Sequence, residues 1–378
     1  MKRFLTVFFM RGVNRAHLYK DVGMIPYIMA KDYGWESGLA YIKGNEDIID
    51  DVYEKNVKLH SIDFSKNKFV QWINILNFIK GNAKNYDTIN FYHGGRKIYL
   101  MAFLFKLLNF RCKIYLKLDL NQDNFEKCTT KSSSIIQISK QIIQNYFLKY
   151  LIDIYSVETK KFFKKMKDLP KYKDKLIYIP NGMLVDEENV VNIEKENIIL
   201  TVGRIGAYEK NHELLLDSIA KINRDNINKW KVYFVGPIVE KKFLEYVEQV
   251  YNKKPYLRDI IIFTGNISDK KELYKIYAQA KIFCLTSRWE SFGIALLEAL
   301  FFKNYIITTD YPAAYDLTAG ETFGTIIPSE DVKAFTDSLE EVMNGNVNIE
   351  VSGTKAQEYV IEYFDWKKIV RKLDQYLV

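Results

Sequence analysis

The stretch KIFCLTSRWESFGIALLEAL, residues 281–300, joins a buried strand, a short polar loop and an apolar helix. The apolar run KIFCLTS predicts the strand, and good helix formers from about Phe292 to Phe302 predict the helix. Glu290 lies in the loop, and Glu298 lies eight positions later, about two turns into the helix. Two solvated surface acids would show the same spacing, so the pair alone leaves a structural and a functional interpretation open.

The same alternation of strand and helix runs through the whole chain. In the second half the pattern predicts the strands NIILTVG, WKVYFVG and IIIFTG and the helices NHELLLDSIAKI, EKKFLEYVEQVY and KKELYKIYAQA. In the first half it predicts the strands RFLTVFF, SGLAYI, KLHSIDF, TINFYH and CKIYLKLDL and the helices MIPYIMAKDYG, QWINILNFIKGNA and KIYLMAFLFKLLNF. Such alternation is typical of parallel sheets with helices on both faces, so the fold class expected is α/β.

The length of 378 residues allows two domains. The segment YIPNGMLVDEENV carries Pro180, Asn181 and Gly182 and is expected to form the hinge between them. We therefore predict an N-terminal domain over residues 1–185 and a C-terminal domain over residues 186–361. The C-terminal helix, residues 362–378, is expected to pack back on the first domain.

Composition excludes several classes of protein. Hydrophobic residues make up 48% of the chain and aromatic residues 15%, which indicates a packed globular protein. Cys112, Cys128 and Cys284 are too few and too scattered for a disulfide framework or a zinc site, which favours a reduced, cytoplasmic setting. The opening MKRFLTVFFM is followed by Arg11 and has no small-residue cleavage site, so we interpret it as a buried strand and not as a signal peptide.

Positive charge is concentrated in the first half. Residues 1–190 carry a net charge of +11 and the remainder −3, which together give the +8 of the whole chain. Residues 97–113 and 135–151 mix lysines with apolar residues at helical spacing, and residues 160–175 add a basic cluster. This pattern predicts a peripheral contact with an anionic inner membrane face, although core stripes with solvated lysines would look the same. No nucleic-acid-binding module is recognisable, so no nucleic-acid partner is expected.

Polar residues follow the predicted strands of the second half, where parallel sheets place their ligands. Gly203, Arg204 and Lys210 come after NIILTVG, and Gly236 ends WKVYFVG. An arginine and a lysine beside helix N-termini suit a diphosphate. An acid further along a helix, as Glu298 is, suits the vicinal hydroxyls of a ribose.

Residues 198–300 resemble the donor domain of the retaining glycosyltransferases of family 4, which have the GT-B architecture. The pieces that carry the resemblance are TVGR…EKNHELLLDSI, YFVGP, FTGNIS…ELYKIYAQAKIFCLTS and ESFGIALLEAL, in the family's order and spacing. The two acids match its Glu-x7-Glu pair, and YIPNGM matches its interdomain segment. The resemblance implies two Rossmann-like domains that face each other across a cleft, although it covers the first half only by layout.

The resemblance also implies roles for single residues. Arg204 and Lys210 would bind the donor diphosphate and neutralise its growing charge, Glu290 would contact the donor sugar, and these three are the candidate catalytic residues. Glu298 would hold the ribose hydroxyls. Further donor contacts are expected from residues in the loops and at helix starts: Gly23 in a predicted loop of the first half, Gly203, Gly236, Asn266, Ile267, Phe292, Gly293 and Ile294.

The acceptor side departs from the family's pattern. The family often has a histidine where Asp119 stands, and Asp119 would either polarise an acceptor hydroxyl or cap a turn. His93, beside two glycines after a predicted strand, would either contact the acceptor or form a structural turn. His212, two positions after Lys210 at a helix start, is expected to be exposed. No Asp-x-Asp triplet occurs, so neither a metal ion nor another cofactor is expected.

The function expected is the transfer of a hexose or N-acetylhexosamine from a nucleotide sugar, preferably a UDP-sugar, with retention of configuration. The acceptor expected is a glycan or a lipid-linked glycan made for a surface polysaccharide or glycoconjugate. The alternative is a catalytically silent GT-B subunit that supports a partner transferase. The presence of both cations and both acids favours the enzyme.

Overall fold

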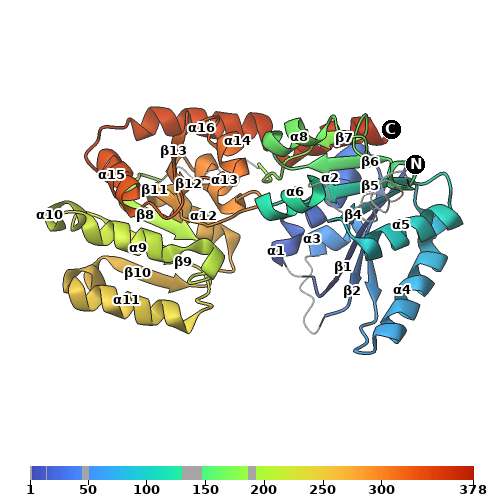
Figure 1. Cartoon of the computed structure of the whole chain (residues 1–378), viewed down its shortest axis with the longest axis horizontal. Coiled ribbons are helices and arrows are strands. Elements are labelled where there is room, and N and C mark those ends of the chain that lie inside the picture. Colours follow the sequence, from blue (N-terminus) through green and yellow to red (C-terminus); the bar gives the residue numbers. More distant parts are fainter. Residues whose placement is uncertain (1, 14, 45–50, 130–146, 186–192) are drawn as a thin grey trace, which may run out of the picture. The chain divides into compact units, whose positions relative to one another are not determined.

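The computed structural model describes residues 2–13, 15–44, 51–129, 147–185 and 193–378. The chain forms two compact units, Met1–Leu184 together with Phe364–Val378, and Val185–Tyr363. Each unit has a parallel sheet with helices packed against it (Figure 1). The α/β fold class is therefore confirmed. No helix in the described ranges has the length and apolarity needed to cross a bilayer.

In the described part of the first unit, seven parallel strands form one sheet in the order β3-β2-β1-β4-β5-β6-β7. The strands are β1 (Arg3–Arg11), β2 (Glu36–Ile42), β3 (Val57–Ile62), β4 (Thr88–Tyr92), β5 (Lys113–Leu118), β6 (Ile154–Val157) and β7 (Leu176–Tyr178). The helices are α1 (Arg15–Leu18), α2 (Asp21–Tyr33), α3 (Asp51–Glu54), α4 (Lys68–Asn82), η1 (Ala83–Asn85), α5 (Arg96–Leu108), α6 (Gln122–Thr129), α8 (Lys160–Met166) and α17 (Trp366–Leu377).

In the second unit, six described strands form a parallel sheet in the order β10-β9-β8-β11-β12-β13. The strands are β8 (Glu196–Val202), β9 (Lys231–Val235), β10 (Ile261–Gly265), β11 (Ala280–Leu285), β12 (Tyr305–Thr309) and β13 (Gly324–Ile327). The helices are η3 (Tyr208–Lys210), α9 (His212–Lys221), α10 (Arg224–Ile227), α11 (Lys241–Lys253), η4 (Pro255–Asp259), α12 (Lys270–Gln279), α13 (Ile294–Phe301), α14 (Pro312–Leu317), α15 (Val332–Met343) and α16 (Ile349–Tyr363).

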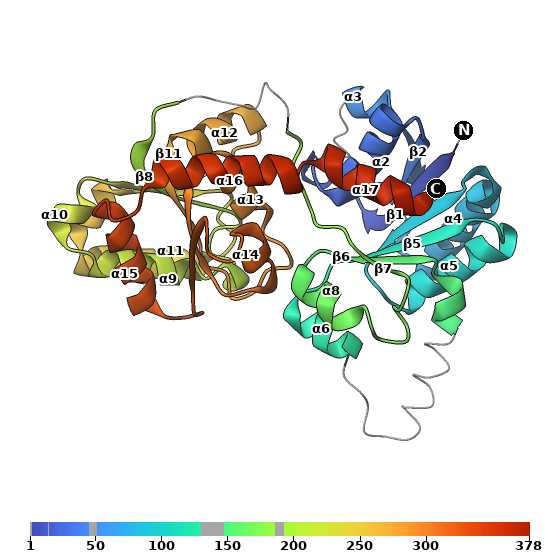
Figure 2. The same ribbon diagram turned by 90° about the horizontal axis from the view of Figure 1, so that it is seen from above.

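The last helix belongs to the first unit. Figure 2 shows α17 lying along α2, and Trp366 is fully buried in the core that the two helices share. The Trp35 indole donates to Asp374 at 2.8 Å, and the Tyr33 hydroxyl donates to the carbonyl of Lys367 at 3.0 Å. The chain passes from one unit to the other near residues 184 and 364. These two segments are hydrogen-bonded to each other, because Met183 pairs with the backbone of residues 364–366.

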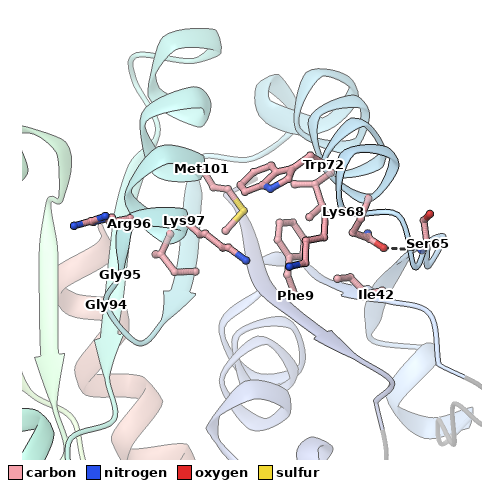
Figure 3. Close-up of a pocket in the computed structure, with 13 residues that line it drawn as sticks. Phe9, Ile42, Ser65, Lys68, Trp72, Gly94, Gly95, Arg96, Lys97 and Met101 are labelled. Carbon is pink, nitrogen blue, oxygen red and sulfur yellow. Dashed lines mark hydrogen bonds between the residues drawn. The ribbon is translucent and has the colours of Figure 1, made fainter.

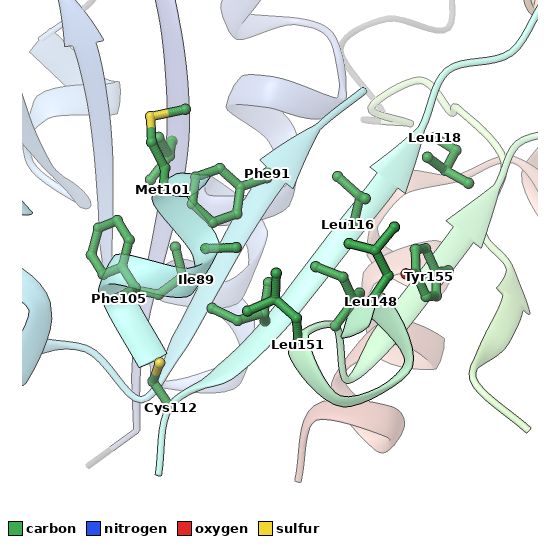
Figure 4. Packing of buried hydrophobic residues seen from close by; sticks show 14 of the residues in the cluster. Ile89, Phe91, Met101, Phe105, Cys112, Leu116, Leu118, Leu148, Leu151 and Tyr155 are labelled. Atoms are coloured by element: carbon green, nitrogen blue, oxygen red, sulfur yellow. The ribbon is translucent and has the colours of Figure 1, made fainter. Parts of the chain in front are cut away.

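Apolar residues on α5 and on the neighbouring strands build one core of the first unit (Figure 4). Phe91 of β4 meets Phe105 of α5 edge to face at 6.0 Å, and both side chains are fully buried. Cys112 is buried at the end of this cluster. Burial of this apolar surface, worth about 25 cal/mol per Å², fixes α5 on the sheet.

A buried lysine ties α2 to the sheet. The Lys117 ammonium on β5 lies 2.5 Å from a Glu158 carboxylate oxygen after β6 and 3.3 Å from one of Asp21, the first residue of α2. Burial by itself would lower the pKa of Lys117, but the charges of Glu158 and Asp21 raise it above its ordinary value. The ammonium is therefore held charged inside the unit.

The beginning of α2 differs from the sequence prediction. Gly23 was expected in a loop, but it lies in the first turn of α2, which begins at Asp21. A Cβ on Gly23 would come within 2.3 Å of the Leu18 carbonyl oxygen, so the close approach that requires a glycine is to the protein's own backbone. Most of the predicted apolar segment 135–151 lies outside the described residues.

Replacement of Lys117 by methionine is expected to destabilise the first unit by about 3–5 kcal/mol, because it leaves the Glu158 carboxylate buried and uncompensated. The urea midpoint, followed by near-ultraviolet circular dichroism, measures the loss. The double variant K117M/E158L should recover part of it, since the orphaned charge is removed as well. An unchanged midpoint in K117M would show that the ammonium is not held in this cluster.

Candidate functional site

Two charged side chains meet where the central strands of the second sheet end. β8 and β11 are neighbours in the sheet, so the loops that follow them leave its carboxyl edge side by side. Lys210 ends η3 in the first loop, and Glu290 lies between β11 and α13. Their ammonium and carboxylate form an ion pair, and both side chains are largely buried. The Ser287 hydroxyl donates to the same Glu290 oxygen at 2.8 Å.

Further hydrogen bonds fasten these two loops together. The Thr286 hydroxyl donates to the carbonyl of Lys210 at 2.8 Å, and the backbone N–H of Arg288 donates to the carbonyl of Glu209 at 2.8 Å. From the end of β12, the Thr309 hydroxyl donates to the carbonyl of Ser287 at 2.5 Å. These three hydrogen bonds hold the two loops in place. Lys210 and Glu290 are therefore preorganised to stabilise charge on a ligand.

Arg204, the second predicted cation, is held less firmly. It follows β8 and pairs with Glu209 of η3, but its side chain stays 64% exposed. An exposed ion pair contributes little stability, so its guanidinium can exchange the carboxylate for another anion at low cost.

Glu298, the second acid of the Glu-x7-Glu pair, lies on α13 with its side chain 8% exposed. Its partner is Lys270, the first residue of α12. Burial by itself would lower the pKa of Lys270, but the Glu298 charge raises it above its ordinary value. Sequence reasoning missed Lys270. The available signal was its place at a helix start directly after a strand and loop, the same context as Lys210.

Two glycines allow backbone segments to approach closely at this edge. Gly236, after β9, has φ +137°, and a Cβ there would lie 1.8 Å from the carbonyl oxygen of Gly203. Gly293, the N-cap of α13, has φ +87°, and its Cβ would lie 2.5 Å from the Tyr311 hydroxyl. Both positions therefore require glycine, and the N–H groups at the start of α13 are left uncovered by a side chain.

The remaining donor-side candidates lie around the same edge. Asn266 is exposed after β10 and donates to Ser268 at 3.0 Å, and Ile267 is half-buried beside it. Phe292 is buried below the loop, and Ile294 opens α13. Their roles toward a donor stay predictions.

The two acceptor-side candidates lie in the first unit. His93 is exposed directly after β4, with φ +59°, and its backbone N–H donates to the carbonyl of Lys117 at 2.9 Å. Asp119 follows β5, the next strand in the sheet, and its Oδ1 is buried with no hydrogen-bond partner among the described residues. In the same described ranges, no group of three or more His, Cys, Asp or Glu residues is arranged to hold a metal ion.

The predicted exposure of His212 is wrong. Its ring is 2% exposed and lies 5.8 Å from the rings of both Phe234 and Phe243. Its Nδ1 accepts a hydrogen bond from the backbone N–H of Gly206 at 3.2 Å, which ties the loop after β8 to α9. Burial and the charge of Lys210 lower the pKa of His212 to about 3, so the ring stays neutral at physiological pH.

Comparison with known families identifies the second unit. Residues 185–364 match the family described as "Glycosyl transferases group 1". The chain therefore contains a glycosyl transferases group 1 domain. This domain holds Arg204, Lys210, Glu290 and Glu298.

Similar proteins support the same assignment and the fold of the whole chain. An α-1,4-N-acetyl-D-galactosaminyltransferase from Campylobacter jejuni, named for a diNAcBac-PP-undecaprenol glycan, is 29% identical over 154 residues. The match covers 40% of this chain and 40% of that relative. Sucrose-phosphate synthase from Thermosynechococcus elongatus superposes with a TM-score of 0.70 at 16% identity and covers 99% of this chain and 98% of that one. Alr3699/HepE from Anabaena, in complex with UDP and glucose, gives 0.67 at 12% identity and covers 99% of both chains. The GT-B fold is thereby confirmed.

The buried His212 should make stability depend on pH. Its folded pKa is lowered from the ordinary 6.5 to about 3, so between these values only the unfolded chain takes up the proton and stability is lost as pH falls. From pH 7 to pH 5 this group should cost about 2 kcal/mol. The variant H212N keeps an acceptor for Gly206 but does not titrate. Urea titrations at both pH values should therefore show a smaller loss for H212N, and equal losses would contradict a buried neutral ring.

Proposed function

We propose that the chain is a glycosyltransferase that moves a hexose or N-acetylhexosamine from a UDP-sugar to a glycan or lipid-linked glycan. We place it in the biosynthesis of a surface polysaccharide or glycoconjugate. The observation that carries this proposal is the Lys210–Glu290 ion pair. It lies at the carboxyl edge of the sheet, in the residues that match the glycosyl transferases group 1 family. Glu298 lies on α13, the helix that follows Glu290, and pairs with Lys270 of α12. It adds the second acid that a nucleoside would need.

The proposed roles follow from the charges. Lys210 and Arg204 bind the diphosphate and stabilise the negative charge that it gains as the bond to the sugar C1 breaks. The acceptor hydroxyl oxygen forms the new bond to C1 on the same face, and its proton passes to the departing phosphate oxygen. Glu290 contacts the sugar, and Glu298 accepts hydrogen bonds from the ribose hydroxyls. Retention of configuration rests on the resemblance to family 4, and the cations take the part that a metal ion plays elsewhere.

Two similar proteins support the choice of donor and acceptor. The Anabaena structure was solved with UDP and glucose, and the Campylobacter jejuni relative is named for a glycan linked to undecaprenol through a diphosphate. We therefore propose UDP as the nucleotide and a lipid-linked glycan as the acceptor.

The presence of the charged groups favours the enzyme over the alternative, a catalytically silent subunit. Arg204, Lys210, Glu290 and Glu298 are all present, and each forms an ion pair with an opposite charge. Slow hydrolysis of a UDP-sugar by the purified chain, with release of the sugar as the α-anomer when the donor is α-linked, supports the enzyme. No turnover of any UDP-sugar and no binding of UDP would reject the proposal.

Substitutions of Lys210, Glu290 and Glu298 should affect turnover and donor affinity to different extents. Lys210→Ala removes a contact that strengthens in the transition state, so turnover should fall a hundredfold to a thousandfold, equivalent to about 3–4 kcal/mol. Glu290→Gln should also chiefly lower turnover. Glu298→Gln should weaken donor affinity more than turnover, because the ribose contact is the same in ground and transition states. Steady-state kinetics with the matched control Lys253→Ala, an exposed lysine on α11, measures the split. Parent rates in folded variants would show that these residues take no part in the reaction.

We also propose that the first unit makes a peripheral contact with an anionic membrane. Leu100, Phe103 and Leu107 recur along one stripe of α5 and are 39–66% exposed, and Phe110 beyond its end is 77% exposed. The basic cluster of α8 contributes further exposed charge through Lys160, Lys161, Lys164 and Lys165. Apolar side chains that enter the interface, together with lysines worth about 1 kcal/mol each near anionic lipid, would hold the protein reversibly.

The double variant L107S/F110S should lose most of its co-sedimentation with phosphatidylglycerol vesicles at low salt. The control L244S removes an exposed leucine of α11 in the second unit and should sediment like the parent. Higher salt should weaken the binding of the parent, since surface charges are screened over about 10 Å at 0.1 M. A parent chain that stays in the supernatant at low salt would end the proposal.

A further inference from the structure

The first unit contains a cavity of about 680 Å³, and none of the candidate donor or acceptor residues lines it. It lies between the first turns of α4 and α5, over the ends of β1 and β2 (Figure 3). Its size is within the range of small-molecule sites. Like the candidate site of the second unit, it is at the carboxyl edge of a parallel sheet, where such folds bind ligands.

The lining of the cavity is mainly apolar, and it also includes cationic side chains. The apolar lining comes from the two helices and the strand ends: Phe9, Ile42, Trp72, Ile75, Ile98 and Met101. Figure 3 shows the side chains of Lys68 and Lys97 extending from the two helices toward Phe9, whereas Arg96 points away. Within the described residues, neither Lys68 nor Lys97 has a carboxylate partner. Each of the two ammonium groups is therefore available to an anion.

Two further donors lie at the same place. The Gln71 Nε2 amide is buried at the lining and has no hydrogen-bond partner in the described structure, while its Oε1 is used by the N–H of Ser65 at 2.8 Å. Gly95 caps α5 without a side chain, so the N–H groups of the first turn are open and carry the positive end of the helix dipole. Four independent groups thus favour negative charge in an otherwise apolar cavity.

The two helices that line the cavity also carry exposed apolar side chains. Phe69, Ile73 and Leu76 are exposed along α4, and Leu100, Phe103 and Leu107 are exposed along α5. An occupant with a charged end and a long apolar body matches this combination, because the lysines bind the charge while the body continues over apolar side chains. Free pyrophosphate would leave the apolar lining unused.

We propose that this cavity binds the diphosphate end of an isoprenoid-linked acceptor. The diphosphate lies between Lys68 and Lys97 at the start of α5, and the first isoprene units lie against Trp72, Met101 and Phe9. The inference rests on the proposed function for the identity of the acceptor, and it adds a binding site in the first unit that the donor residues do not supply.

Farnesyl diphosphate, a short and soluble isoprenoid diphosphate, is the probe. Calorimetric titration is made with UDP at saturation, so that the diphosphate does not report the donor site. The parent should bind farnesyl diphosphate more tightly than either farnesol or inorganic pyrophosphate. The variant K68A/K97A should bind it at least about tenfold more weakly, since each lost charged hydrogen bond is itself worth that factor or more.

The variant K80A/K84A is the matched control, because it removes the same charge from exposed lysines at the far end of α4 and in η1. It should bind the probe as the parent does. Equal affinities of the two double variants, or equal binding of farnesyl diphosphate and pyrophosphate by the parent, would overturn the site.

Enzyme assays separate this proposal from the proposed function. For K68A/K97A, transfer to an isoprenoid-linked acceptor should fall more than UDP-sugar hydrolysis, with the larger effect on the acceptor KM. A parent chain that binds the probe through Lys68 and Lys97 but never turns over a UDP-sugar would reject the glycosyltransferase and keep the cavity as a lipid-diphosphate site. Active transfer that is equally fast in both double variants would reject the cavity and keep the enzyme.

Discussion

The pairing of β8 with β11 in the second sheet determines where the charges of the candidate site lie. Because the two strands are parallel neighbours, the loops that follow them leave the same edge, and Lys210 meets Glu290 although 80 residues separate them. The hydrogen bonds from Thr286, Arg288 and Thr309 then hold both loops in place. An electrostatic site needs this rigidity, since charges aimed in advance cost no reorganisation during a reaction.

The site charges differ in how firmly they are held, and the difference fits a division of tasks. Lys210, Glu290 and Glu298 are largely buried in ion pairs, whereas Arg204 is mostly exposed. A fixed charge suits a group whose position relative to the breaking bond matters. An exposed arginine suits a group that closes on a diphosphate after it arrives, because its present ion pair is weak.

The same edge of the first unit's sheet carries two different arrangements of charge. Around Lys117 the charges are buried and satisfy one another, so they join α2 to the sheet. At the cavity between α4 and α5, the lysines have no carboxylate partner among the described residues, and the lining is apolar. Buried charges that are paired contribute to structure, whereas unpaired cations beside a cavity are available to a ligand.

The sequence by itself determined the parallel α/β class and most of the strands and helices, because buried strands and amphipathic helices leave distinct periods. It also placed Glu290 in a loop and Glu298 on the following helix, since both acids belong to one continuous strand–loop–helix segment. Only the tertiary structure decided what depends on distant parts of the chain. Lys270 reaches Glu298 across 28 positions, His212 is buried by aromatic side chains of β9 and α11, and Gly23 is required by the backbone of Leu18. The local sequence pattern reveals the period of a strand or helix. The contacts and the burial of a side chain depend instead on which distant segments the sheet brings together.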